Sequence, residues 1–404
     1  MAPDDDAGGR HVLRLCSVFE PEATHFDDDA ARFDPIGGMQ NHTAALSRCL
    51  DALGVQQTVL TARLAASRGV SPLGERGTVR RVGVRSSRLR QLWGVCALRR
   101  VLAPPRPVEL VHAHQGEDVA TLLLGLLASV VHRCPLVVTL HCSVRHTVVG
   151  RSPRSWLLRL VGGAVERAAL RRADAVVALV PRTADLLRLD GVPNDRVHVL
   201  PSGFDPDIFR GGTVDAFPEV PRPRIGYVGR LCAQKRPDLL VEAFGRLRSE
   251  GHLVVVGDGP MRGDVLAAVR SSPAHDRITV TGFVPHVEVP QVLASLDLLV
   301  LPSAYEEMGS VLVEAMASGL PVVASRVGGI PAVVADGETG LLVPPGDVDA
   351  LAAALDELLA DPDRRLRMGA AARERADHYS WPDLAGRVQI LYDELVALRK
   401  SARP

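Results

Sequence analysis

The chain has 404 residues, which exceeds the usual size of a single hydrophobic core and predicts two domains. Its 47 basic and 47 acidic residues cancel to a formal net charge of zero, which excludes a strong general attraction to nucleic acid. The start of the chain is acidic and polar, unlike a secretory signal, and the longest uncharged apolar run, 119–131, is too short to span a bilayer. We therefore expect a cytoplasmic protein with a disordered acidic tail at 1–10.

Short apolar runs rich in β-branched residues alternate with amphipathic stretches along the whole chain. In the first half these runs are 12–19, 57–62, 108–114, 135–142, 173–179 and 196–203, and in the second half they are 224–231, 252–259, 277–284, 296–303, 320–325 and 339–344. Continuous apolar strands separated by helices indicate parallel sheets that are covered on both faces. The predicted fold class is α/β, with two doubly wound, Rossmann-like parallel-sheet domains facing a central cleft.

The domain boundary is marked by composition. Glycine and proline cluster around 206–223 without a helical period, which predicts a linker between a domain at 11–205 and a domain at 224–378. The last segment, 379–404, has an amphipathic helical pattern, and it is predicted either to close the second domain or to cross back onto the first. Six cysteines are scattered without a CxxC pair, so we expect free thiols in a reducing compartment.

Candidate site residues in the first domain lie where predicted strands end, because ligands bind at that edge in this fold class. The turn at 36–41 precedes a predicted helix at 42–53, and Gly38 would let the backbone approach a phosphate. Four histidines end or follow strands, namely His112, His114, His141 and His146. His141 directly ends an apolar run and is the candidate for a sugar hydroxyl, whereas structural roles are favoured for the others. The HxH pattern lacks a third ligand at suitable spacing, so no metal site is predicted.

Acidic residues gather around the same predicted edge. Glu20 and Asp34 lie in the loop at 19–38, and Glu117 and Asp118 follow the strand that carries the HxH pattern. Carboxylates around the mouth of a site favour a cationic substrate by attraction and steering. The alternative is a solvated acidic loop without a binding role.

The second domain carries two cations and two carboxylates with a clearer pattern. Arg230 and Lys235 lie five residues apart across a turn after a strand. The planar guanidinium of arginine can bind two oxygens at once and the ammonium of lysine adds a compact charge, a combination that suits a diphosphate. Lys235 is one of only two lysines, which favours a function over the alternative of a solvated surface cation. Glu306 precedes and Glu314 lies within a predicted helix, where carboxylates accept hydrogen bonds from paired hydroxyls and free N–H groups face an anion. Together these groups predict a sugar nucleotide.

The motifs form a set that resembles the retaining glycosyltransferases of family 4, which have the GT-B fold. The resemblance covers nearly the whole chain and is carried by GGM (37–39), the arginine and lysine of GRLCAQK (229–235), GDGP (257–260), TGFVP (281–285), EEMGSVLVE (306–314), VGGIP (327–331) and DGETGLLVPPGD (336–347). One position departs from the family pattern, because Met308 stands where a phenylalanine is usual. Methionine is more pliable, so the donor-sugar pocket is expected to differ there.

The resemblance implies a role for each matched residue. Arg230 and Lys235 would clamp the donor diphosphate, and Gly38 would approach it from the first domain. The remaining implied contacts are Glu314 to the ribose, Glu306 to the transferred sugar, the N–H groups of Met308, Gly309 and Ser310 to the sugar or phosphates, Val284 to the base, and His141 to the sugar beside the acceptor. The implied reaction retains the anomeric configuration, uses no metal or other cofactor, and lets the departing diphosphate help to deprotonate the acceptor.

Over the whole chain, and in the segments LRLCSVFEPEA (13–23), RFDPIGGMQNHTAAL (32–46) and VTLHCSVRHT (138–147), the sequence also resembles actinobacterial glycosyltransferases of aminoglycoside antibiotic biosynthesis that act on 2-deoxystreptamine pseudodisaccharides. This resemblance implies a UDP-sugar donor and a small aminocyclitol acceptor similar to paromamine or neamine, with Glu20, Asp34, Glu117, Asp118 and His146 near it. One alternative is a membrane-associated transferase for a lipid carrier or exopolysaccharide that uses the helix around Trp156 and the arginines from Arg80 to Arg100, although a solvated amphipathic face is favoured for both. Another alternative is a non-catalytic sugar-nucleotide-binding protein. The oligomeric state and the identity of the donor sugar stay open.

Overall fold

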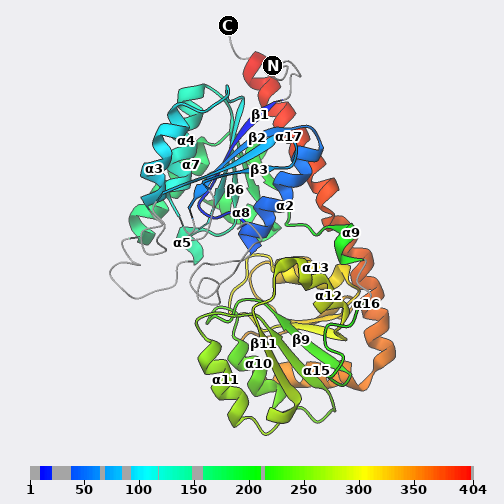
Figure 1. The fold of residues 1–404 in the computed structure, drawn as a ribbon. Helices are drawn as coiled ribbons and strands as arrows, with labels where there is room; N and C mark the ends of the chain where they lie inside the picture. Colours follow the sequence, from blue (N-terminus) through cyan, green and yellow to red (C-terminus); the bar gives the residue numbers. More distant parts are fainter. Residues whose placement is uncertain are drawn as a thin grey trace. The chain divides into compact units, whose positions relative to one another are not determined.

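The computed structural model describes residues 10–20, 38–63, 69–83, 92–116, 118–147, 158–210 and 214–401. These residues fall into two compact units, each built around its own sheet (Figure 1). Unit 1 takes the described residues of Met1–His25, Met39–Pro201 and Pro382–Pro404, and unit 2 takes those of Phe26–Gly38 and Ser202–Trp381. None of the described helices combines the length and the apolar character needed to cross a membrane.

Unit 1 contains an eight-stranded sheet in the order β3-β4-β2-β1-β5-β6-β7-β8. Its strands are β1 (His11–Cys16), β2 (Gln56–Ala62), β3 (Val70–Leu73), β4 (Gly77–Val82), β5 (Leu110–Gln115), β6 (Leu136–Leu140), β7 (Ala175–Ala178) and β8 (Val197–Val199). All pairings are parallel except that of β3 with β4. The carboxyl ends of the parallel strands therefore lie along one edge of the sheet.

Helices cover both faces of this sheet. They are α2 (Gly38–Ala52), α3 (Trp93–Leu102), α4 (Ala120–His132), α5 (Val144–Thr147), α7 (Gly163–Arg172), α8 (Pro181–Leu189) and α17 (Trp381–Ser401). Figure 1 shows α3, α4 and α7 on one side and α2 and α17 on the other. The last helix, α17, returns to unit 1 from the end of the chain, where Lys400 pairs with Glu109 at 3.2 Å and Gln389 donates to the carbonyl of Leu53 at 3.3 Å.

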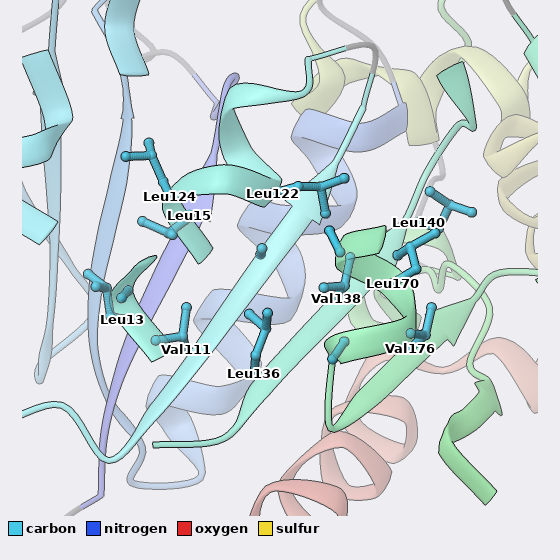
Figure 2. Packing of buried hydrophobic residues seen from close by; sticks show 14 of the residues in the cluster. Leu13, Leu15, Val111, Leu122, Leu124, Leu136, Val138, Leu140, Leu170 and Val176 are labelled. Atoms are coloured by element: carbon cyan, nitrogen blue, oxygen red, sulfur yellow. The ribbon is translucent and has the colours of Figure 1, made fainter. Parts of the chain in front are cut away.

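The two faces of the unit 1 sheet differ in chemistry. On the side of α4 and α7, Leu13 and Leu15 of β1, Val111 of β5 and Val138 of β6 pack into one apolar cluster, shown in Figure 2. Successive strand residues point to opposite faces, so Arg14 of β1 and His112 and His114 of β5 lie on the other face. The register agrees, because Arg14 stands opposite His112 in the neighbouring strand. One face therefore carries the larger apolar cluster, and the other carries buried polar side chains beside a smaller apolar cluster, beneath α2 and α17.

Unit 2 contains a six-stranded sheet in the order β11-β10-β9-β12-β13-β14, and all its pairings are parallel. Its strands are β9 (Arg224–Val228), β10 (His252–Val256), β11 (Ile278–Gly282), β12 (Leu298–Leu301), β13 (Val322–Ser325) and β14 (Gly340–Val343). Its helices are α9 (Pro206–Phe209), α10 (Pro237–Phe244), α11 (Arg262–Ser271), α12 (Val289–Ala294), α13 (Ser310–Ala317), α14 (Ile330–Val333), α15 (Val348–Ala360) and α16 (Pro362–Ala376). The central strand β9 lies between β10 and β12, so the loops after these strands meet.

The predicted fold class is confirmed, and each of the predicted apolar runs contains a strand. Two strands, β3 and β4, were not predicted. They form an antiparallel pair at the edge of the sheet, where β4 alternates buried and half-buried residues around Arg80 and Arg81. Arg81 is buried and donates to the hydroxyl of Ser71 at 2.7 Å, which corrects its interpretation as part of a solvated arginine face. Trp156 lies outside the described residues.

Candidate functional site

The loops after β9 and β12 bring Lys235 and Glu306 together in unit 2. The two loops are tied by hydrogen bonds from the Ala304 N–H to the Gln234 carbonyl at 2.8 Å and from the Gln234 side chain to the Tyr305 carbonyl at 3.0 Å. The Lys235 ammonium forms an ion pair with the carboxylate of Glu306, which is 8% exposed. A carboxylate and a cation that are paired at the carboxyl edge of a parallel sheet can exchange this partner for a polar ligand.

Arg230 lies two residues after the end of β9 and has spare hydrogen-bonding capacity. Its carbonyl accepts from the Tyr227 hydroxyl at 2.8 Å, which fixes the backbone of the turn. Its side-chain Nε is buried without a hydrogen-bond partner among the described residues, and no described carboxylate forms an ion pair with it. A guanidinium has five N–H donors and no acceptor, so an incoming anion would complete its bonding.

The start of α13 supplies backbone N–H groups next to Glu306. Gly309 has a positive φ of 81° and precedes the first helical residue, Ser310, where N–H groups lack partners inside the helix. The side chain of Met308 is 2% exposed, and its Sδ accepts from the Ser202 N–H at 3.1 Å. The Met308 side chain therefore packs in the interior of unit 2, and its influence on the donor-sugar pocket stays a prediction.

The backbone of Gly328 and Gly329 packs closely against the backbone of Glu306. The Gly329 N–H donates to the Glu306 carbonyl at 3.0 Å. A Cβ at Gly328 would lie 1.7 Å from that same carbonyl oxygen, so only glycine fits there. The VGGIP motif thus positions the Glu306 backbone by close contact.

Glu314 lies in α13 and meets a residue that the sequence did not single out. His286 Nε2 lies 3.1 Å from Glu314 Oε1, and the Glu314 side chain is largely buried. His286 begins the short 3-10 helix His286–Glu288 after β11, two residues beyond Val284. The signal that could have found it is its place directly after the TGFVP motif, where β11 ends. Val284, His286 and Glu314 therefore line one side of the unit 2 edge.

In unit 1, three of the predicted histidines and one further histidine form a buried cluster. His114 Nδ1 lies 3.1 Å from His141 Nε2, and the rings of His112 and His114 stack with centroids 4.3 Å apart. His42 of α2 meets His141 edge-on at 4.6 Å, and sequence spacing gave no hint of this contact. His146 lies in α5, but its side chain is outside the described part of the structure.

Burial keeps these imidazoles neutral. Desolvation lowers the pKa of His141 to about 3. It also lowers the pKa of His42, His112 and His114 well below the ordinary value, and neighbouring Arg14 adds to the effect. None of the four imidazoles therefore carries a charge near neutral pH, and they act there as fixed hydrogen-bonding groups.

The histidine cluster also has the spacing of a metal site, contrary to the sequence argument that no third ligand is near. Ligand atoms of His42, His114 and His141 lie within 4.8 Å of one another. However, Arg14 Nη1 lies 2.9 Å from His114 Nε2, and a guanidinium can only donate. His114 thereby gives one lone pair to Arg14 and carries its proton on the other nitrogen, so it has no lone pair left for a metal.

The acidic residues predicted around the acceptor fare differently. Asp34 and Glu117 lie outside the described residues. Glu20 forms an ion pair with Arg48. Asp118 is a structural residue, which corrects its prediction as an acceptor contact: it is 5% exposed and accepts from the Trp93 indole at 2.8 Å and from the start of α4. Gly38 is the first residue of α2, which begins four residues earlier than predicted.

Comparisons with known proteins agree with the two-unit architecture. Residues 36–208 match the family model Glycosyltransferase Family 4, and residues 216–375 match Glycosyl transferases group 1. A 2-deoxystreptamine N-acetyl-D-glucosaminyltransferase from Streptomyces fradiae is 36% identical over 407 residues, covering 93% of each chain. A 2-deoxystreptamine glucosyltransferase from Streptomyces kanamyceticus is 34% identical over 383 residues, covering 89% of this chain and 99% of the relative.

Solved structures give the same fold. Sucrose-phosphate synthase from Thermosynechococcus elongatus is 26% identical with a TM-score of 0.82, covering 96% of this chain and 100% of that one. The Anabaena protein HepE, solved with UDP and glucose, has a TM-score of 0.74 at 20% identity over 96% of this chain and 100% of that one, which shows the fold alone. The chain therefore belongs to the family 4 glycosyltransferases of the GT-B fold and is a transferase enzyme.

Proposed function

We propose that the enzyme transfers a hexose, an amino-hexose or a pentose from a UDP-sugar to a hydroxyl of a small cationic aminocyclitol, with retention of the anomeric configuration, in aminoglycoside antibiotic biosynthesis. The binding of a UDP-sugar donor is supported by two contacts at one edge of the unit 2 sheet. These are the Lys235–Glu306 ion pair and the hydrogen-bond contact of His286 with Glu314. Cations, buried carboxylates and free N–H groups at this edge match the diphosphate and hydroxyls of a sugar nucleotide.

The donor would be held by groups with distinct tasks. Arg230 and Lys235 bind the diphosphate, and the N–H groups of Gly309 and Ser310 add to this anion site. Glu314 accepts from the ribose hydroxyls while His286 fixes its orientation. Glu306 accepts from hydroxyls of the transferred sugar, and Val284 borders the base.

Donor binding would exchange the partners of one ion pair. Lys235 is paired with Glu306 in the protein alone, and the donor offers a diphosphate to Lys235 and sugar hydroxyls to Glu306. The leaving diphosphate gains negative charge as the glycosidic bond breaks, so the cations stabilise the transition state more strongly than the ground state. Electrostatic stabilisation of the leaving diphosphate is therefore favoured over nucleophilic attack by Glu306. The Glu306 carboxylate is assigned to hydrogen bonds from the sugar in the ground state and in the transition state alike. No metal ion takes part in the proposal.

The acceptor half rests on the relatives rather than on the described carboxylates. The relatives from Streptomyces fradiae and Streptomyces kanamyceticus are both named for transfer to 2-deoxystreptamine, and they are similar over most of this chain. Glu20 and Asp118 are engaged within unit 1, so they lend no support to a cationic acceptor. The proposed acceptor is therefore 2-deoxystreptamine or a pseudodisaccharide that contains it, such as paromamine.

The test is a mass-spectrometric screen of purified protein with UDP-glucose, UDP-N-acetylglucosamine and UDP-xylose against 2-deoxystreptamine, paromamine and neamine. We expect one donor and acceptor pair to give a product with the mass of one added sugar. Proton NMR of that product should show the anomeric coupling of an α-linkage. The uncharged cyclitol myo-inositol is the matched acceptor control and should give no product. Transfer to myo-inositol but to none of the amines would contradict the acceptor class, and failure to bind any UDP-sugar would contradict the donor.

A further inference from the structure

A buried arginine lies at the centre of the polar face of unit 1. Arg14 is 0% exposed in the middle of β1, and no carboxylate among the described residues forms an ion pair with it. Its guanidinium instead donates to His114 Nε2 at 2.9 Å and to the Tyr392 hydroxyl at 3.2 Å. Removing a guanidinium from water without a counter-charge is costly. The residue is therefore poorly explained by stability alone, and its partners suggest what it does.

The bonds of Arg14 fix the proton positions along a chain of imidazoles. A guanidinium only donates, so His114 Nε2 accepts, and a neutral His114 must carry its proton on Nδ1. That Nδ1–H faces His141 Nε2 at 3.1 Å, so this second nitrogen also accepts. A neutral His141 must then carry its proton on Nδ1. The direction of every bond in this chain follows from the one group that cannot accept.

The second nitrogen of Arg14 that donates a hydrogen bond, Nη2, bonds to a residue of the C-terminal helix α17. The Tyr392 hydroxyl of α17 accepts from Arg14 and also contacts His112 Nδ1, to which it donates. His112 then donates from Nε2 to the Thr139 hydroxyl at 2.7 Å. Arg14 is thus restrained on both sides, and the last helix of the chain takes part in the same network.

We infer that Arg14 is a positioning residue that holds His141 in the Nδ1–H tautomer, so that His141 serves the transfer reaction as a hydrogen-bond donor and not as a base. The inference rests on the proposed function and on the family resemblance, which implies that His141 lies at the sugar beside the acceptor. Among the described residues, no group pairs with Nδ1 of His141, and the side chain keeps 9% exposure at the carboxyl end of β6. The nitrogen that carries the proton is therefore the one left for a ligand.

The lowered pKa of His141, about 3, agrees with this role. A base that takes a proton from an acceptor hydroxyl needs a free lone pair and a pKa near the working pH. His141 has neither, since its Nε2 is occupied by His114. A neutral imidazole that donates Nδ1–H to a hydroxyl oxygen needs no change of protonation during the reaction.

The tautomer can be measured without any substrate by two-bond proton–nitrogen correlation NMR on protein labelled with ¹⁵N-histidine, with His141→Gln used to assign the His141 signals. We expect His141 Nδ1 to show the shift of a protonated nitrogen and Nε2 that of an unprotonated one. In Arg14→Met, His114 is free to change its tautomer, so the His141 signals should move toward a mixture of the two forms. The kcat of this variant should fall roughly tenfold to a hundredfold, with the KM for the UDP-sugar little changed.

Two internal controls separate this effect from damage to the fold. Arg81→Met makes the same substitution at another buried strand arginine of the same sheet, which bonds to Ser71 rather than to a histidine, and it should leave the His141 shifts unchanged. His11 of β1 donates from Nδ1 to the Pro107 carbonyl at 2.9 Å, so its signals should be constant in every folded variant. Should Arg14→Met fail to fold, Arg14→Gln keeps a polar side chain that can accept as well as donate, so it no longer fixes the proton of His114 and should show the same change of tautomer.

An Nε2–H tautomer of His141 in the unmodified protein would overturn the inference. Unchanged His141 shifts in the folded Arg14 variants would overturn it as well, and so would a changed tautomer without loss of kcat. A protein that shows the expected tautomers but transfers no sugar would instead refute the proposed function, because the NMR experiment contains no substrate. The two failures are therefore distinguishable.

Discussion

The two lysines of this chain form a matched pair for testing the diphosphate site. Lys235 pairs with buried Glu306, whereas Lys400 of α17 is exposed and pairs with Glu109, the residue before β5. In the proposed mechanism Lys235→Met removes a cation that faces charge developing on the leaving group, so we expect kcat to fall by roughly a hundredfold to a thousandfold. Lys400→Met should leave kcat within about twofold, because exposed ion pairs contribute little. Steady-state kinetics with the best donor checks both values, and equal activity of the two variants would contradict the assignment.

At the residue scale, sequence reasoning worked where the neighbours in the chain define the environment. Lys235 and Glu306 lie in the loops after β9 and β12, and Glu314 lies in α13, the helix that follows β12, so their place at the sheet edge was predictable. Arg14 was not, because it lies inside the apolar run VLRLC, and a strand pattern does not say what lies across the sheet. Tyr392 is 378 residues from Arg14 in the chain, and only the return of α17 brings the two together.

The start of α4 depends on Asp118, which the sequence had suggested as an acceptor contact. Its carboxylate accepts from the Trp93 indole at 2.8 Å, from the Ala120 N–H at 2.8 Å and from the Thr121 hydroxyl at 3.0 Å. Asp118→Ala would leave these donors without a partner in a buried place, so we expect a loss of about 1–3 kcal/mol in the free energy of unfolding. Urea denaturation measures this loss, and the KM for the acceptor should be unchanged.

Asp185→Ala is the matched control for Asp118, because Asp185 is an exposed carboxylate of α8 that pairs with Arg188. It should change the free energy of unfolding by less than about 0.5 kcal/mol. A large rise in the acceptor KM for Asp118→Ala, without loss of stability, would restore Asp118 as an acceptor contact.

Two glycines of unit 2 show two different reasons why a position requires glycine: a positive φ, and a lack of room for a Cβ atom. Gly328 and Gly346 both have positive φ, 54° and 79°. At Gly346 an added Cβ meets nothing within 4 Å, whereas at Gly328 it would lie 1.7 Å from the Glu306 carbonyl oxygen. Gly346→Ala should therefore cost only the backbone strain of about 1–2 kcal/mol and keep full activity. Gly328→Ala should in addition displace Glu306 and reduce kcat on the order of a hundredfold. Similar kcat values for the two variants would show that the close approach to Glu306 has no role.

At the element scale, apolar periodicity located every described strand except β3 and β4. Buried parallel strands are continuous apolar runs, which makes them distinct from helices and loops. β3 has four residues including Pro72, and β4 places Arg80 and Arg81 between Val79 and Val82. Neither sequence is a continuous apolar run, because β3 is a short edge strand and β4 carries two arginines, so both depend on the neighbouring sheet and give little signal of their own.

At the scale of the whole molecule, the buried histidines make stability depend on pH. The folded pKa values of His42, His112, His114 and His141 are lowered by burial, while an unfolded histidine has a pKa near about 6.5. As pH falls below that value, the unfolded chain takes up protons that the folded protein refuses, so the stability present above about pH 6.5 is progressively lost. All four histidines lie in unit 1, so this loss should be concentrated in that unit.

Each of the four histidines should cost roughly 1 kcal/mol between pH 6.5 and pH 5.5, or about 4 kcal/mol together, a large share of the stability of an ordinary domain. Urea midpoints at pH 7.5, 6.5 and 5.5 measure the slope, and hydrogen exchange of peptides from β1, β5 and β6 locates it in unit 1. His42→Gln removes one titrating group and should reduce the slope by less than a quarter, because burial also lowers the pKa of His11 and His198 of unit 1. His275→Gln, at an exposed position of unit 2, should leave it unchanged. Stability that stays constant from pH 7.5 to 5.5 would mean that these imidazoles gain protons in the folded protein as readily as in the unfolded chain, and that the polar face of unit 1 is open to water.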